Sequence, residues 1–145
     1  GLTSLKVWQK SIELAEKIHK DFIPTLPKEE KWALSNQIRR SSQSIGANIA
    51  EGYGRYYYQE GVRFCYIARG SLEETYSHLH FARKMEYLTA EDFSSYADLI
   101  EEIRRMISGY IAYLKKVKTG KDEPGSGIFE TPAEYILEPD EKEET

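Results

Sequence analysis

Arginine and tyrosine side chains gather around a glycine-containing segment near the middle of the chain. Arg55 is followed directly by Tyr56, Tyr57 and Tyr58. Guanidinium groups bind phosphate through paired hydrogen bonds, and tyrosine rings stack on unpaired bases. We therefore predict that the chain binds RNA or DNA through arginines and tyrosines at nine positions: Arg39, Arg40, Arg55, Tyr56, Tyr57, Tyr58, Arg63, Arg104 and Arg105. Tyr53 belongs to the same group of tyrosines, and further candidates for phosphate contacts are Arg69, Lys115, Lys116 and Lys118.

The same tyrosine-rich segment has a second interpretation. Large aromatic side chains also bury much area at subunit interfaces at little entropic cost. A protein-interaction surface is therefore the alternative to a nucleic-acid-binding surface.

Charge is distributed unevenly along the 145 residues. The formal net charge is -4, but residues 121–145 hold nine acidic residues and two lysines, a balance of -7. Residues 1–120 therefore carry 18 basic against 15 acidic residues, or +3. A mildly basic body with an acidic tail allows phosphate binding, and the tail either competes with phosphate or adds solubility.

A polar stripe accompanies an apolar stripe in the second predicted helix. Its members recur at steps of four and three residues: Gln37, Ser41, Ser44, Asn48 and Glu51. Because the stripe borders apolar positions, we expect it to be partly buried, with Asn48 and Glu51 bonded to the next helix at Ser71, Arg69 or a backbone group. The predicted structural network consists of Gln37, Ser44, Asn48, Glu51, Ser71 and Glu74.

Catalytic and metal-binding patterns are weak. Gly52-Tyr53-Gly54-Arg55 lacks the lysine and the spacing of a phosphate-binding loop. Glu74 and His78 are four residues apart, whereas di-iron bundles pair these residue types at a spacing of three. The single cysteine, Cys65, lies in an apolar stretch and is expected to be a structural thiol. We expect a protein that is not an enzyme, with no cofactor and no metal.

Four segments with apolar residues at helical spacing must position these side chains. They are expected at residues 4–22, 27–50, 57–85 and from residue 89 onward. The first is expected to have Thr3 or Ser4 as N-cap, and its inward stripe is predicted to be Trp8, Ile12, Ala15, Ile18 and Phe22. Thr89 and Asp92 have the spacing of a capping box.

The fold prediction is all-α: an antiparallel up-down-up-down four-helix bundle over residues 1–118, followed by an acidic, mostly irregular tail over residues 119–145. Within the tail, Ile128-Phe129 and Tyr135-Ile136-Leu137 either dock on a bundle or belong to a plain linker. No apolar run is long enough for a membrane span. With one cysteine, the expected location is the reducing cytoplasm.

Three blocks of the sequence resemble a bacterial family of four-helix-bundle proteins encoded within intervening sequences of 23S ribosomal RNA genes. The blocks are Leu34-x-x-Gln37-Ile38-x-Arg40, Ser44-Ile45-x-x-Asn48-Ile49-Ala50-Glu51-Gly52-x-x-Arg55 and Phe64-x-x-Ile67-Ala68-Arg69-Gly70-Ser71-Leu72-x-Glu74. The opening Leu5-Lys6-Val7-Trp8-Gln9-Lys10-Ser11 also fits. Ser41 and Thr75 depart from the alanine and leucine that are usual at those positions.

This resemblance implies a homopentameric ring of antiparallel bundles with no established enzymatic activity. The family is related to the accessory variability protein of diversity-generating retroelements, which associates with a reverse transcriptase and nucleic acid. The resemblance therefore implies two partner classes besides other copies of the chain: RNA or DNA, and a reverse transcriptase.

Overall fold

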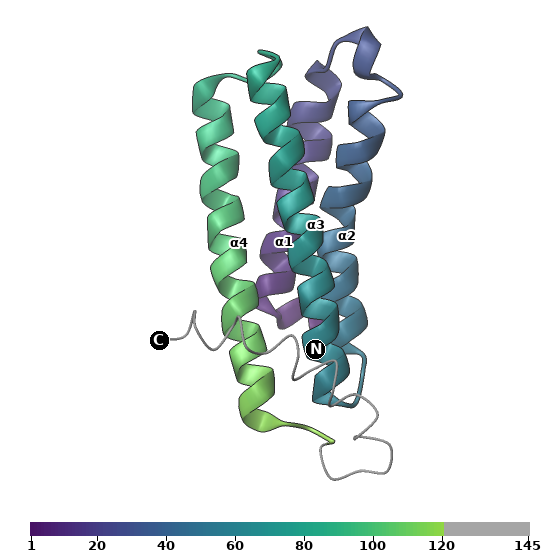
Figure 1. Cartoon of the computed structure of the whole chain (residues 1–145), viewed down its shortest axis with the longest axis vertical. Coiled ribbons are helices and arrows are strands. Elements are labelled where there is room, and N and C mark those ends of the chain that lie inside the picture. The colour runs from purple at the N-terminus through teal and green to yellow at the C-terminus, as the bar shows by residue number, and fades with distance from the viewer. Residues whose placement is uncertain (121–145) are drawn as a thin grey trace.

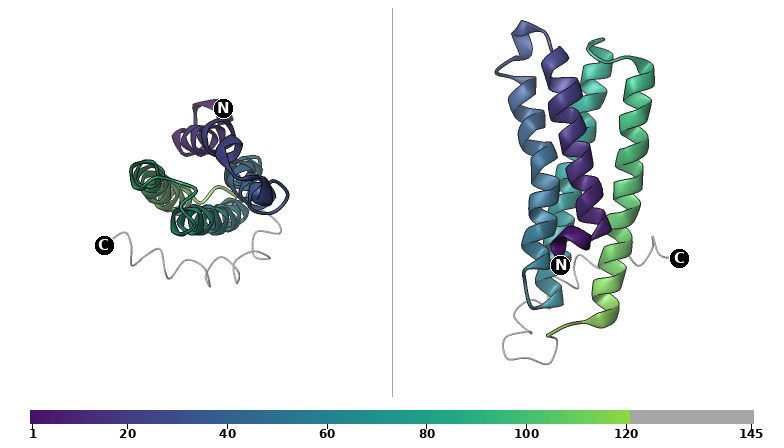
Figure 2. Two further views of the ribbon diagram at one scale, coloured as in Figure 1. Left: turned by 90° about the horizontal axis from the view of Figure 1, so that it is seen from above. Right: turned by 180° about the vertical axis from the view of Figure 1, so that it is seen from behind.

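The computed structural model describes residues 1–120, which form a four-helix bundle (Figure 1). The helices are α1 (Lys6–Lys17), α2 (Leu34–Tyr53), α3 (Tyr58–Lys84) and α4 (Ala90–Val117). Successive helices run in opposite directions, and α1 also packs against α4, which closes the bundle (Figure 2). The predicted all-α antiparallel bundle is confirmed. The prediction for the tail, including its two apolar groups, falls on residues 121–145 and lies outside the described residues.

The core is built from one apolar stripe on each helix. In α4 the buried stripe is Tyr96, Ile100, Ile103, Ile107 and Ile111. In α3 it includes Ala68, Leu72, Thr75, Leu79 and Ala82. Each fully buried leucine or isoleucine contributes about 1.5–3 kcal/mol relative to an exposed one. These stripes provide most of the driving force that holds the helices side by side.

The predicted stripe of α1 was wrong by one position. The buried residues are Val7, Ser11, Leu14, Ile18 and Phe22, which include only two of the five predicted. Ile12 is 42% exposed. Ser11 can occupy the buried stripe because its hydroxyl donates a hydrogen bond to the carbonyl oxygen of Val7, 2.7 Å away. Because this buried residue is polar, the spacing of apolar residues alone predicted the wrong inward face of α1.

The connection between α1 and α2 is less regular than predicted. Regular α-helix ends at Lys17, and Ile18–Phe22 continues as a wider π-type turn. α2 begins at Leu34 and not at residue 27 or 28, because Lys28–Glu30 forms a separate short turn and Ala33 has φ -114° and ψ -93°. The side chain of Glu30 accepts a hydrogen bond from the Leu34 amide at 3.3 Å and from the Tyr87 hydroxyl at 2.9 Å. This carboxylate ties the start of α2 to the α3–α4 loop.

Of the two N-caps predicted from the sequence, one is present in the structure. At α4, the Thr89 hydroxyl oxygen accepts a hydrogen bond from the Asp92 amide at 3.1 Å, which confirms the predicted cap. At α1, the N-cap is Leu5 without a side-chain hydrogen bond. The predicted Thr3 or Ser4 cap is wrong because both residues belong to the short turn Leu2–Ser4 that precedes the helix.

A close approach between α2 and α3 explains why a glycine lies inside a helix at residue 52. α2 was predicted to end near residue 50, but it continues through Gly52 to Tyr53. A Cβ atom at Gly52 would lie 2.9 Å from the Phe64 Cβ and 3.1 Å from the Gly61 carbonyl oxygen. The glycine therefore permits contact between two backbones and does not break the helix.

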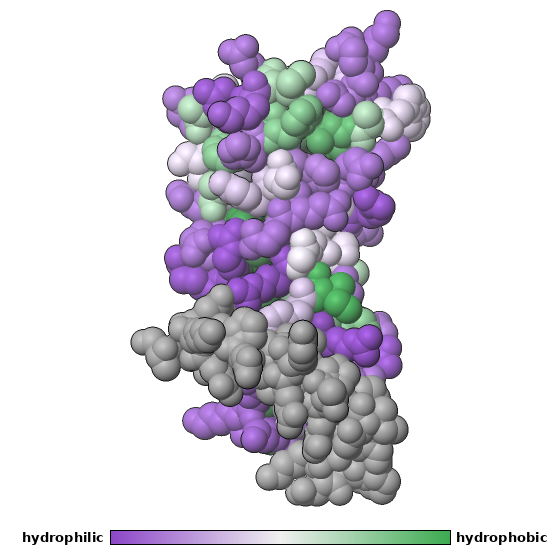
Figure 3. Space-filling model, viewed as in Figure 1, coloured by the Kyte–Doolittle hydropathy of each residue, from purple (hydrophilic) through white to green (hydrophobic). Residues whose placement is uncertain are grey.

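The two ends of the bundle differ. One end contains the α3–α4 loop and the segment before α2, where Trp32 is 76% exposed and Phe81 and Met85 are about half exposed. Figure 3 shows hydrophobic residues gathered at this upper end, above a mostly hydrophilic band. At the other end α1 stops short of the α2–α3 turn and of the C-terminal turns of α4 (Figure 2, right). No helix within residues 1–120 has both the length and the apolar character that a membrane span requires.

Candidate nucleic-acid interface

The tyrosines around Arg55 lie at the turn between α2 and α3. Tyr53 is 42% exposed and Tyr56 is 57% exposed, whereas Tyr57 and Tyr58 are partly buried. The rings of Tyr56 and Tyr57 pack edge to face with centroids 5.3 Å apart. Two of the four rings are therefore exposed to solvent, and the other two are partly buried in the turn.

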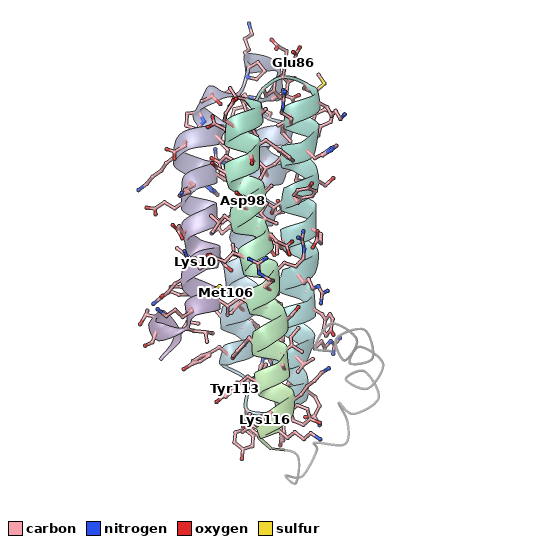
Figure 4. All side chains as sticks on the ribbon, turned by 90° about the vertical axis from the view of Figure 1, so that its left-hand side faces the viewer. Lys10, Glu86, Asp98, Met106, Tyr113 and Lys116 are labelled. Atoms are coloured by element: carbon pink, nitrogen blue, oxygen red, sulfur yellow. The ribbon has the colours of Figure 1, made fainter. Side chains whose placement is uncertain are left out.

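The C-terminal turns of α4 lie at the same end of the bundle. Figure 4 shows Tyr113 and Lys116 near this end and Glu86 at the opposite end. Tyr113 is 58% exposed and lies nearly parallel to Tyr110, with ring centroids 6.3 Å apart. Lys116 and Lys118 are exposed and form no ion pair with any residue of 1–120. The lysines also complement the negative end of the α4 dipole.

The Tyr110 side chain remains an uncharged phenol at neutral pH. Burial raises its pKa to about 12, and the nearby Cys65, Tyr53 and Tyr113 side chains add to the effect. A neutral ring next to Tyr113 adds no negative charge that would repel phosphate. We call the set Tyr53, Tyr56, Tyr113, Lys116 and Lys118 the basic–aromatic end.

Arg55 is adjacent to this surface but already has partners. Its guanidinium lies 2.6 Å from the Glu51 carboxylate and 3.4 Å from that of Glu60, and it covers the Phe64 ring at 5.2 Å. Two carboxylates compensate its single charge. Arg55 therefore adds less positive potential to the turn than the sequence indicated.

Arg104 and Arg105 lie in the middle of α4 beside acidic residues. The Arg104 Nε and Nη2 atoms donate to the two carboxylate oxygens of Glu73 on α3, at 2.7 and 2.9 Å, and Nη1 donates to Glu101. These hydrogen bonds, led by those to Glu73, raise the pKa of Arg104. Arg105 lies 3.6 Å from Glu101. The Arg104 guanidinium joins two helices and has few donors left for phosphate.

The remaining predicted arginines lie on separate faces. Arg39 and Arg40 line a shallow hollow on the outer face of α2, together with Asn36, Gln43, Ser44 and Ala47. Arg40 donates to Gln37 at 2.7 Å and lies 3.7 Å from Glu74. Arg63 is exposed on α3. The nine predicted positions thus form several groups and not one continuous patch.

The predicted polar network is only partly a contact between helices. Ser44 and Ser71 meet across α2 and α3 with hydroxyl oxygens 2.9 Å apart. Asn48 does not reach α3, because its amide donates to the Ser44 carbonyl and hydroxyl oxygens at 2.8 and 2.9 Å. Glu51 is exposed and pairs with Arg55. The expectation that Asn48 and Glu51 bond to α3 is wrong, since both lie at the edge of the buried stripe.

Two further predicted members of the network are surface residues. Gln37 is exposed and bonds to Arg40, whereas Glu74 lies 3.2 Å from the His78 ring nitrogen. The buried interhelical contact is between Ser41 and Thr75, whose hydroxyl oxygens are 2.9 Å apart. The signal for it was present in the sequence, because these are the two positions that depart from the family pattern.

Sequence reasoning also missed Tyr113. It lies far along the chain from the tyrosine run, and only the fold brings α4 to the α2–α3 turn. Its spacing of three from Tyr110, followed by two lysines, is the available signal. Within residues 1–120, no group of three or more His, Cys, Asp or Glu side chains is placed to hold a metal ion.

Residues 1–120 are therefore an antiparallel helical bundle with hydroxyl contacts between α2 and α3 and a basic, aromatic surface at one end. Residues 3–109 match the family described as 23S rRNA-intervening sequence protein, and the chain belongs to that family.

A solved structure agrees with this assignment. The crystal structure of a protein of unknown function from the S23 ribosomal protein family of Bacteroides thetaiotaomicron VPI-5482 has a TM-score of 0.67 and 32% sequence identity. The match covers 72% of this chain and 97% of that chain. No curated protein matches the chain.

Proposed function

We propose that this protein is a non-catalytic, homo-oligomeric scaffold that binds RNA or DNA through its basic–aromatic end. The observation that carries the proposal is the position of three exposed tyrosine rings beside two lysines that are unpaired within residues 1–120. Lysine attracts phosphate, and an exposed ring stacks on any base regardless of sequence. Single-stranded nucleic acid fits this surface, because its bases are free to stack.

The expected assembly is a homopentamer, which the sequence resemblance implies. An apolar side chain on the flank of the bundle is compatible with subunit contacts, since Ile12 is 42% exposed. A ring of five subunits multiplies weak contacts through effective concentration. Sedimentation equilibrium of the full chain tests this number, and a monomer would contradict it. We place the protein in the cytoplasm because its sequence holds one cysteine, Cys65, and therefore no disulfide within one chain.

The binding test uses the full chain and a fluorescent single-stranded oligonucleotide. We expect affinity to fall steeply as salt rises from about 50 to about 200 mM, because bound phosphates release counterions. The double variant Lys116→Glu and Lys118→Glu should weaken binding about tenfold or more and reduce the salt slope by about two.

The matched control is Lys84→Glu, which changes an exposed lysine at the opposite end of the bundle. This single variant changes the net charge by half as much as the double variant does. We expect its affinity for the oligonucleotide to stay within about twofold of wild type. Equal losses in the two variants would mean that only net charge matters. No binding at low salt would overturn the proposed function.

A second candidate function is supported by the opposite end of the bundle. Trp32 is 76% exposed, and Phe81 and Met85 are 46% and 47% exposed. Exposed aromatic and methionine side chains are typical of protein-binding surfaces. A protein partner such as a reverse transcriptase would dock here without direct contact between this chain and nucleic acid. Such docking would be lost in Trp32→Ala and would change little with salt.

A further inference from the structure

The chain leaves the bundle at a defined point on the basic–aromatic end. After α4, the Thr119 carbonyl oxygen accepts a hydrogen bond from the Tyr58 amide at 3.0 Å. Gly120 follows with φ 78°, and a Cβ atom there would lie 2.7 Å from the Tyr57 ring and 3.0 Å from the Tyr56 ring. Only glycine allows this left-handed turn so close to two rings. Gly120 therefore lies directly beside the proposed nucleic-acid surface.

An open face of α3 starts next to this exit point. Arg63, Ile67 and Gly70 are spaced by four and three residues, so they lie on one side of the helix. Arg63 is exposed and forms no ion pair with residues 1–120, and Ile67 is 44% exposed. No heavy atom lies within 4 Å of a Cβ built on Gly70. We call these three residues the α3 stripe, which has a positive charge at its start and an apolar centre.

The remaining 25 residues have the composition and the length to occupy this surface. They carry a net charge of -7, opposite to the +3 of residues 1–120. Ile128-Phe129 begins eight residues after Gly120, and an extended chain of eight residues spans at most roughly 27 Å. Ile67 is nine residues beyond Tyr58, about 14 Å along α3. The apolar pair can therefore reach the centre of the α3 stripe.

We propose that residues 121–145 bind back onto the α3 stripe and the basic–aromatic end. Ile128 and Phe129 contact Ile67, while acidic side chains pair with Arg63 and Lys116. The segment then acts as an internal competitor for nucleic acid, because its carboxylates take the place of phosphates. The docking stands independently of the proposed function, whereas the competition rests on it.

A spin label tests the docking without any nucleic acid. In full-length Ala133→Cys, a nitroxide reagent reacts at residue 133, because the native Cys65 is buried. We expect paramagnetic broadening of backbone amide signals over residues 58–70. The broadening should decrease in Ile67→Glu and in salt of about 0.5 M, where charge pairing is screened. Ser77→Glu, an exposed site further along α3, is the matched control and should leave it unchanged.

Amide signals of residues 58–70 that are no more broadened than those at the opposite end of the bundle would overturn the docking. Broadening that Ile67→Glu and Ser77→Glu leave equally intact would overturn the assignment to the α3 stripe.

Oligonucleotide binding then tests the competition. A full-length variant in which the nine acidic residues of 121–145 become asparagine or glutamine should bind about tenfold tighter at low salt. The variant Ile128→Ser with Phe129→Ser keeps every charge and should also bind tighter, because it removes the apolar anchor. Wild-type affinity in both variants would contradict internal competition. Failure of wild type and both variants to bind would instead refute the proposed function, and the spin-label result would still decide the docking.

Discussion

The Thr75 hydroxyl oxygen on α3 lies 2.9 Å from the Ser41 hydroxyl oxygen on α2, and both residues are buried. Thr75 also lies 2.8 Å from the Ser71 carbonyl oxygen in its own helix. Thr75 has one hydroxyl proton, so it donates to one of these two oxygens at a time. With the Ser44–Ser71 contact, these groups form a short hydroxyl ladder between α2 and α3.

Thr75→Val should destabilise the bundle by about 1–2 kcal/mol. Valine has nearly the same shape, so the main loss is the hydrogen bond between the two side chains, which leaves the buried Ser41 hydroxyl with the 3.4 Å contact to the Ile38 carbonyl oxygen. Urea denaturation followed by circular dichroism measures the free energy of unfolding. Ser77→Ala, at an exposed position of the same helix, is the control and should change it by less than about 0.5 kcal/mol. A Thr75→Val protein as stable as wild type would show that the ladder contributes nothing.

Gly52→Ala should destabilise the fold by about 1–3 kcal/mol, because the added methyl group would overlap Phe64 and the Gly61 carbonyl oxygen. Gly109→Ala is the matched change in α4, where no heavy atom lies within 4 Å of the new Cβ. There alanine should stabilise the protein by about 0.5–1 kcal/mol. Thermal melts of the two variants should move in opposite directions, and a shift of the same sign in both would argue against the close α2–α3 contact.

Arg104 and Glu73 should be energetically coupled, because their paired hydrogen bonds join α3 to α4. A double-mutant cycle with Arg104→Ala and Glu73→Ala should give a coupling energy of about 0.5–1 kcal/mol, the range for well-formed surface pairs. Arg104→Ala should also leave oligonucleotide affinity within about twofold of wild type. A loss of affinity as large as that of the Lys116 and Lys118 double variant would show that Arg104 belongs to the binding site.

Alkaline pH should lower the free energy of unfolding through Tyr96 and Tyr110. Burial raises the pKa of each to about 12, against about 10 in the unfolded chain. Above pH 10 the unfolded state releases these protons first, so stability is unaffected below pH 10 and falls between pH 10 and pH 12. The loss should be about 1–3 kcal/mol per ring, because each pKa unit corresponds to about 1.4 kcal/mol and Tyr96 is buried while Tyr110 is partly buried.

Urea unfolding at stepped pH measures this dependence, and Tyr96→Phe should remove about half of the decline. An unchanged slope in that variant would contradict the role of Tyr96.

The fold could be predicted because apolar periodicity is strong in α3 and α4. The prediction from apolar periodicity failed in α1, because the Ser11 hydroxyl forms a hydrogen bond within the helix and this polar residue can therefore lie on the inward face. It also misplaced both ends of α2. At its start, Ala33 interrupts the helix although neither a proline nor a glycine stands there. At its end, Gly52 lies inside the helix because α3 packs closely against it, and this contact is visible only once Phe64 is placed.

The candidate site was predictable in residue type and not in arrangement. Tyr53 and Tyr56 stand beside Arg55 in the sequence, but the partners of Arg55 and Arg104 are set by α-helical spacing and by the pairing of α3 with α4. Charge counting treats all arginines as equal. The structure separates those held by carboxylates from Lys116 and Lys118, which form no ion pair within residues 1–120.

Photo-crosslinking tests the central claim most directly. An iodouracil-substituted single-stranded oligonucleotide is irradiated with the full chain, and crosslinked peptides are identified by mass spectrometry. We predict crosslinks at Tyr53, Tyr56 or Tyr113, lost when Lys116 and Lys118 are changed to glutamate and kept in Lys84→Glu. Crosslinks confined to the α2 face around Arg39, or to the opposite end near Trp32, would contradict nucleic-acid binding at the basic–aromatic end.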